Sequence, residues 1–158
     1  MSSGVTLFLA FFIGIVAGLR SLTAPAVVAW AAHLGWIDLS ASRLAFMGSA
    51  WVVGIFTLLA LLELVADQLP KTPARITAVP LAARIVMGSL TGACVGNAGG
   101  SSLWLGALFG AVGGIAGAFG GYHARVGLVR ALDVPDFAIA IPEDLIAVGF
   151  GLLIVSRF

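Results

Sequence analysis

The sequence predicts an all-α fold, a polytopic bundle of transmembrane helices with five to six membrane segments. The chain has 158 residues, of which 61% are hydrophobic and 9% charged, and its mean hydropathy is +1.14. A soluble domain of this size leaves too much surface exposed to keep so many apolar side chains out of water. The apolar residues form continuous runs, whereas a transmembrane β-barrel alternates apolar and polar residues. We therefore expect one integral membrane domain over residues 1–158.

The first apolar block, residues 5–39, is too long for one crossing, because about 20 residues span the hydrocarbon core. It is interrupted by the sequence GLRSLTAP at residues 18–25. Pro25 removes a backbone donor and disfavours helix at the residue before it. The pattern predicts two short segments, about 5–19 and 25–37. They form either two thin crossings or one crossing and a re-entrant half-helix.

The later apolar runs predict segments at about 44–66, 79–97, 102–122 and 142–157. The segment at about 79–97 ends before a short neutral loop, and the next segment, at about 102–122, is rich in glycine. Its glycines recur at i, i+4 spacing, which lets helix backbones approach closely in lipid. They are Gly106, Gly110, Gly113, Gly114, Gly117 and Gly121. We expect this helix to pack tightly, inside its own bundle or against a second copy, and we expect a homo-oligomer.

Lysine and arginine placement predicts the orientation, because cytoplasmic loops carry an excess of both. Lys71, Arg75 and Arg84 surround one connection, and Arg125 and Arg130 lie in another. Two segments separate these regions, so both face the cytoplasm and the C-terminus lies outside. The side of the N-terminus stays open. The main role that we expect for Lys71 and Arg75 is to set the orientation in the membrane. Binding of lipid phosphates is a secondary role for them.

Two carboxylates, Glu63 and Asp67, are four residues apart and so share one helix face. Like charges on adjacent turns repel, and formal charge is expensive inside a bilayer. The pair is stable if a cation or a proton lies between the two carboxylates, or if Arg20, Arg84 or Lys71 forms an ion pair with them. We therefore predict a proton- or cation-responsive site. The alternative is a structural ion-pair network that anchors one end of the bundle.

Other polar residues are candidates for the same site. Ser21 and Thr23 belong to the interruption in the first block, where free backbone groups are expected. Pro142, Glu143 and Asp144 open the last predicted segment, and proline and acids in a first turn are ordinary helix N-terminal signals. The functional alternative is that these two acids join the first pair on the cytoplasmic side.

Several function classes are not supported by the sequence. A net charge of +1 without a basic stripe argues against a nucleic-acid partner. One cysteine, Cys94, excludes an internal disulfide and a cysteine-based metal cluster. Walker, GxSxG, HExxH and kinase signatures are absent, and we expect no cofactor.

The combination of motifs resembles a known family. The carriers are residues 18–21 (GLRS), the motif ExxxDxxP at residues 63–70, Arg84 with Gly88 in the following helix, and the PED sequence at 142–144. Together they resemble a family of small bacterial integral membrane proteins called domain of unknown function 4126. The resemblance covers most of the chain and implies a multi-pass protein of the bacterial inner membrane. It implies no activity.

The chain departs from that family pattern in two ways. Gln68 stands where the family commonly has lysine, and the loop to the next helix is shorter. A basic residue that would neutralise the acids is then missing. Lys71 is the nearest replacement.

Three function classes follow as hypotheses. The first is a transporter or channel with membrane lipids and a small ion or solute as partners. The second is an enzyme acting on a lipid-linked phosphate, with Glu63, Asp67, Glu143 and Asp144 on Mg²⁺ and basic residues on phosphate. The third is a structural or assembly subunit, in which the charges only hold the bundle together.

Overall fold

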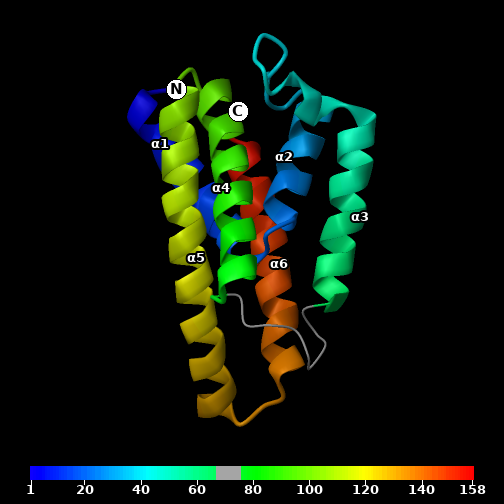
Figure 1. The fold of residues 1–158 in the computed structure, drawn as a ribbon, viewed down its shortest axis with the longest axis vertical. Helices are drawn as coiled ribbons and strands as arrows, with labels where there is room; N and C mark the ends of the chain where they lie inside the picture. Colours follow the sequence, from blue (N-terminus) through cyan, green and yellow to red (C-terminus); the bar gives the residue numbers. More distant parts are fainter. Residues whose placement is uncertain (67–75) are drawn as a thin grey trace.

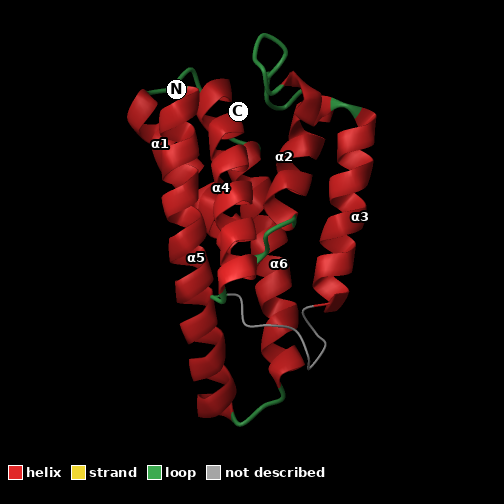
Figure 2. Cartoon of the chain, in the orientation of Figure 1, coloured by secondary structure: helices red, strands yellow, loops and turns green. Residues whose placement is uncertain are grey.

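The computed structural model describes residues 1–66 and 76–158, and these residues form helices and no strands (Figures 1 and 2). The prediction of an all-α fold is confirmed. In chain order the elements are α1 Ser3–Leu19, α2 Thr23–His33, the 3₁₀ helix η1 Ala45–Gly48, α3 Ala50–Ala66, α4 Ala78–Ala98, α5 Leu103–Leu132 and α6 Asp136–Val155.

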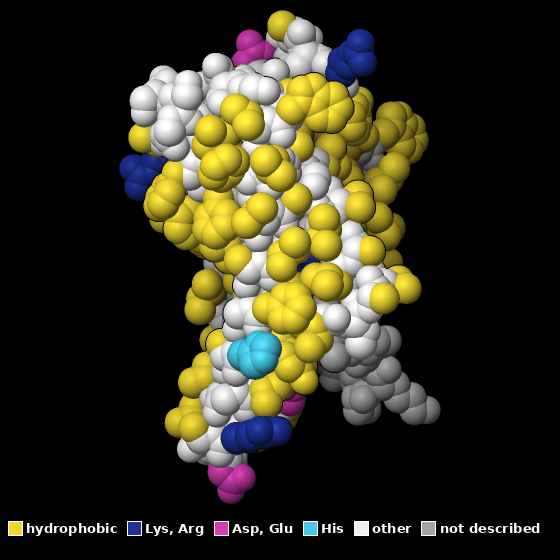
Figure 3. Space-filling view, turned by 60° about the vertical axis from the view of Figure 1, so that its left-hand side comes forward, with side chains coloured by type: hydrophobic (Ala, Val, Ile, Leu, Met, Phe, Trp, Pro, Cys, Tyr) yellow, Lys and Arg dark blue, Asp and Glu magenta, His cyan; other side chains and the backbone are white. Residues whose placement is uncertain are grey.

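Among the described residues, three helices, α4, α5 and α6, are long and apolar enough to cross a membrane. The helices α1 and α3 are also apolar but have 17 residues each. Figure 3 shows a face dominated by apolar side chains, with charged side chains mostly at the two ends. Large residues such as Trp51 and Trp104 are more than three-quarters exposed. Lipid tails rather than water suit such a surface, so this is a membrane-type helical protein.

The helices fall into a tight group and a looser pair. The tight group is α1, α4 and α5, which pack extensively against one another. Helix α6 lies against α1 and α2, while the main packing partners of α3 are α2 and η1. Figure 1 accordingly shows α3 at the edge of the bundle.

The chain reverses between α1 and α2. Figure 1 shows the N-terminus, the loop after α2 and the C-terminus at one end of the molecule. We call residues 20–22, which connect the two helices inside the bundle, the helix break. At the opposite end, α5 extends beyond α3 and α4, and the first turns of α6 accompany it (Figure 1).

Several helix boundaries differ from the sequence prediction. Helix α2 spans Thr23–His33 rather than about 25–37, and α3 begins at Ala50, after η1, rather than near residue 44. Helix α5 continues to Leu132, where Asp133 adopts a left-handed conformation (φ 50°). Helix α6 begins at Asp136, so Pro142 lies inside it rather than at its first position. Charged side chains in both extensions pair with each other, which lets these polar turns remain helical.

The glycines of α5 lie against the backbones of two neighbouring helices. A Cβ on Gly110 would come within 2.0 Å of the carbonyl oxygen of Gly88, and a Cβ on Gly113 within 2.0 Å of that of Phe11. Gly106, Gly110 and Gly114 face α4, and Gly113 and Gly117 face α1. Because these glycines of α5 have no Cβ, the backbones of α1 and α4 can lie close to that of α5, and this sets the distances between the three helices.

We expect Gly110→Ala to lower the free energy of unfolding by about 1–3 kcal/mol, because the added methyl group overpacks a backbone contact. Gly120→Ala is the matched control, since nothing lies within 4 Å of a Cβ there. The control should be neutral or stabilising by up to about 1 kcal/mol from helix propensity. Thermal unfolding in detergent measures both, and equal effects of the two substitutions would contradict this packing.

Candidate functional site

The helix break and the start of α2 bury polar and charged side chains. The side chain of Arg20 is 0% exposed, Ser21 is 7% exposed and Thr23, the first residue of α2, is 3% exposed. The last carbonyls of a helix and the first amides of the next have no intrahelical partner. Unpaired backbone groups are costly in an apolar surrounding. The break therefore requires partners from other helices.

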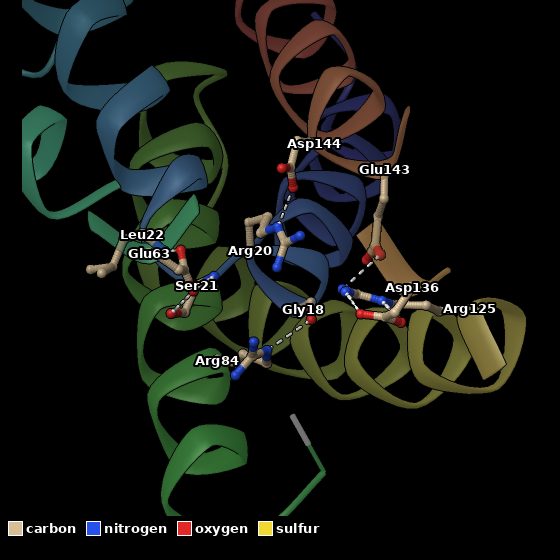
Figure 4. A network of polar contacts seen from close by, with 10 residues as sticks. All are labelled: Gly18, Arg20, Ser21, Leu22, Glu63, Arg84, Arg125, Asp136, Glu143 and Asp144. Carbon is tan, nitrogen blue, oxygen red and sulfur yellow. Dashed lines mark hydrogen bonds and ion pairs between the residues drawn. The ribbon is translucent and has the colours of Figure 1, made fainter. Parts of the chain in front are cut away.

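Glu63 on α3 supplies the partner for the start of α2 (Figure 4). Its Oε1 accepts hydrogen bonds from the backbone N–H of Ser21 at 2.8 Å and from the Ser21 hydroxyl at 2.5 Å. Its Oε2 accepts from the backbone N–H of Leu22 at 2.8 Å. Helix α2 has no side-chain cap of its own, because Leu22 stands at its N-cap position. A carboxylate from another helix thus caps α2, where the helix dipole favours negative charge.

Arg84 on α4 supplies the partner for the end of α1. Its Nε donates to the carbonyl oxygen of Gly18 at 3.0 Å, and its guanidinium also donates to the carbonyl of Pro80 at 3.1 Å. The side chain is buried. A cation at a helix C-terminus complements the dipole. The two helix ends at the break are therefore matched by charges of the appropriate sign.

Arg20 itself is held by α6. Its Nε donates to Oδ1 of Asp144 at 2.5 Å, an ion pair in which the arginine is fully buried and the aspartate 13% exposed. A buried charge is tolerated only when it is paired and hydrogen-bonded. This pair therefore ties the break to the third turn of α6.

A second cluster lies next to this pair. Arg125 on α5 forms an ion pair with Asp136 and another, at 3.6 Å, with Glu143, both on α6. Glu143 directly precedes Asp144, and Figure 4 shows the two clusters side by side. Asp136 is 62% exposed, whereas Arg20 is fully buried. A connected line of charged groups therefore leads from the surface to the break.

The structure brings together most of the described candidate residues. Ser21, Glu63 and Arg84 lie at the break, and Asp144 pairs with Arg20 of the break. Glu143 pairs with Arg125 in the neighbouring cluster. Asp67, Lys71 and Arg75 lie outside the described residues, as do Gln68 and Pro70.

The expected counter-charge for Glu63 is arranged differently. Arg20 pairs with Asp144, and Arg84 binds backbone carbonyls. Within residues 1–66 and 76–158, no lysine or arginine lies within ion-pair distance of the Glu63 carboxylate. Two backbone N–H groups and one hydroxyl donate hydrogen bonds to this carboxylate instead.

Two further observations concern the groups near the helix break that could bind a solute or a metal ion. The Thr23 hydroxyl is buried and has no hydrogen-bond partner in the described part of the chain. In that same part, no three His, Cys, Asp or Glu side chains converge in a way that could hold a metal ion.

Sequence reasoning missed the Arg125–Asp136 pair. The signal was present, because opposite charges flank a short turn around Asp133 and Pro135. The apolar run, however, predicts a helix end near residue 122, before these charges.

Comparison with known proteins identifies the family but no relative of known activity. The sequence model of a family described as domain of unknown function (DUF4126) matches residues 7–156. The chain belongs to the DUF4126 family. The match begins within α1 and covers all later elements, and so it includes the helix break and the charged residues of α5 and α6 described above. Searches of curated proteins and of solved structures find no match to this DUF4126 chain.

We expect Asp144→Asn to lower the free energy of unfolding by about 3–5 kcal/mol, because it removes a negative charge that is hydrogen-bonded to the buried guanidinium of Arg20. Arg20→Met should cost a similar amount. The double variant should cost less than the sum, by about 0.5–3 kcal/mol, if the two side chains are coupled.

Asp136→Asn is the matched control, since that aspartate is largely exposed, and we expect a change of about 0–1 kcal/mol. Reversible unfolding of the four proteins in detergent measures these values. Strict additivity of the two buried substitutions would contradict the coupling.

Proposed function

We propose that the protein is a small membrane transporter or channel in which Glu63 responds to protons. The observation that carries the proposal is the buried helix break, where a single carboxylate from a peripheral helix holds the start of α2. Discontinuous helices of this kind form substrate and ion sites in many transporters. Ionisable residues inside membrane segments commonly mark such pathways.

The membrane arrangement belongs to the proposal. Helices α1 and α2 form a re-entrant hairpin, and α3 to α6 form four further segments. Both termini then lie outside, and the end that carries Arg125 and Arg130 faces the cytoplasm, as the positive-inside rule favours. The setting that fits is the bacterial inner membrane. The break then opens toward the cytoplasmic half of the bundle.

The proposed switch is protonation of Glu63. A charged acceptor forms hydrogen bonds about twice as strong as a neutral one, so a proton weakens the three bonds to Ser21 and Leu22. Helix α3 packs mainly against α2 and η1, and Trp30 on α2 also donates to the Thr57 hydroxyl on α3 at 3.0 Å. The three carboxylate bonds are the hydrogen bonds that hold α3 to the helix break. Their loss would free α3 to separate from the break. The exposed amides and the Thr23 hydroxyl would then be available to a solute.

A proton suits this site better than a metal cation. Three protein donors already surround the two carboxylate oxygens of Glu63. A cation would have to replace N–H groups that point at the same lone pairs. A proton needs only one of these positions.

The same contacts also support a structural role. The charged side chains at the break all bind other helices, as in a network that only stabilises the bundle. Such a protein would conduct nothing. The experiment below separates the two functions.

We expect purified protein in liposomes that contain a pH-sensitive dye to pass protons, or K⁺ or Na⁺ in a pH-dependent manner, above the rate of empty liposomes. Glu63→Gln should change that flux by about 10-fold or more and remove its pH dependence, because the side chain can no longer titrate. Asp38→Asn is the control, since Asp38 is an exposed acid in the loop after α2, hydrogen-bonded by Ser40.

Wild-type flux equal to that of empty liposomes would support the structural role. Unchanged flux in Glu63→Gln would remove the proposed role of this carboxylate. In the same vesicles, with Cys94→Ser as background, Ser2→Cys and Ser156→Cys should react with an impermeant maleimide from the same side. Reaction from opposite sides would contradict the re-entrant hairpin.

A further inference from the structure

An apolar groove runs between α1 and α6 at the end of the molecule that carries both termini. Phe8, Leu9 and Phe12 of α1 form one wall, and Phe150, Leu153 and Ile154 of α6 form the other. Its volume is about 390 Å³. The groove lies far from the helix break and plays no part in the proposed function.

The walls of the groove are ordered by aromatic packing. Phe12 makes edge-to-face contacts with Phe8 at a centroid distance of 4.5 Å and with Phe150 at 5.5 Å. Ile154 belongs to the buried core, whereas Phe8 and Leu153 are about half exposed or more. The groove therefore has a fixed floor and rims that face the lipid.

A single cation, Arg157, lies at the mouth of the groove. It lines the same cavity and follows two residues after α6 ends at Val155. Its side chain is exposed, and no acidic side chain in the described ranges lies within ion-pair distance of it. A positive charge thus stands at the end of an apolar slot, where the helix leaves the membrane.

We propose that this groove binds an anionic phospholipid, with an acyl chain between α1 and α6 and the phosphate on Arg157. Guanidinium groups bind phosphate oxygens in a bidentate manner, and basic residues beside membrane segments attract anionic headgroups. Phe150 and Arg157 are seven residues apart, which on a helix is about 10 Å along the axis. That spacing places a headgroup at the interface and its chain along the aromatic floor.

The amphiphilic character of the site decides the class of ligand. A free phosphate would not fill the apolar groove, and an uncharged alkyl chain would not pair with the charge of Arg157. A zwitterionic lipid carries its own cation beside the phosphate, which competes with the arginine. Charge and shape together therefore select a lipid with net negative charge.

A bound lipid would also join the two helices that hold the Arg20–Asp144 pair. Arg20 directly follows α1, and Asp144 lies on α6. The groove connects the opposite ends of the same two helices.

The test is native mass spectrometry and thermal unfolding of delipidated protein titrated with phosphatidylglycerol or phosphatidylcholine. We expect one phosphatidylglycerol to bind at least 5-fold more tightly than phosphatidylcholine and to raise the unfolding temperature. Arg157→Gln should remove that preference. Arg43→Gln is the matched control, because Arg43 is an exposed arginine in the loop at the same end of the molecule.

Leu153→Trp, which fills the groove from its exposed rim, should lower the affinity for both lipids while Arg157 is retained. Equal binding of the two lipids by the wild type would overturn the proposal, and so would equal losses in Arg157→Gln and Arg43→Gln. Inorganic phosphate alone serves as the remaining arm. If it stabilises the protein as much as phosphatidylglycerol does, the site takes phosphate and the lipid is excluded as its specific ligand.

Discussion

The structure depends on one constraint: two helix ends meet inside an apolar bundle, and their backbone groups must be satisfied there. In water, solvent would do this; in a membrane, only other parts of the protein can. Glu63 binds the amides at the start of α2, and Arg84 binds a carbonyl at the end of α1. Each charge also has the sign that the neighbouring helix dipole favours. The charges that are expensive elsewhere in a bilayer are therefore required at this point.

The same constraint explains how the helices are connected. The carboxylate comes from α3 and the guanidinium from α4, while Arg20 of the break reaches Asp144 on α6. Residues 20–22 and the carbonyl oxygen of Gly18 thus contact three different helices, α3, α4 and α6. The glycine contacts of α5 with α1 and α4 fix the backbone spacing without any polar group. The hydrophobic core also continues from α1 into α2 and α6, so apolar packing and these polar contacts together connect the two parts of the bundle.

Much of the fold could be predicted from the sequence, because helix class and the interruption near Pro25 follow from composition and backbone chemistry. The helix ends near residues 132 and 136 could not, since they depend on the pairing of Arg125 with Asp136. Apolar periodicity ends where charges begin, and it carries no information on whether those charges find partners across a turn. The spacing of residues within a segment also says nothing about which other segment lies beside it.

The sequence offers candidate residues for a site but does not show their contacts. It predicts an arginine or lysine partner for Glu63, whereas in the structure backbone amides and a hydroxyl bind this carboxylate. The backbone of a broken helix offers donors that the sequence does not display, because they exist only when the helix starts at Thr23 inside the bundle. Arg20, with a charge that suited the same acid, has Asp144 as its partner. Pairings between residues 42 to 124 positions apart require the arrangement of the helices.

Hydrogen exchange at the helix break tests the central claim most directly. Mass spectrometry of the peptide that covers residues 18–24 would be compared between the wild-type protein and Glu63→Leu, with a peptide from the α4–α5 contact as reference. If the carboxylate satisfies the amides of Ser21 and Leu22, their exchange should accelerate by about 10-fold or more in the variant, equivalent to about 1.4 kcal/mol of lost protection, with no change in the reference peptide. Equal exchange in the two proteins would contradict the account.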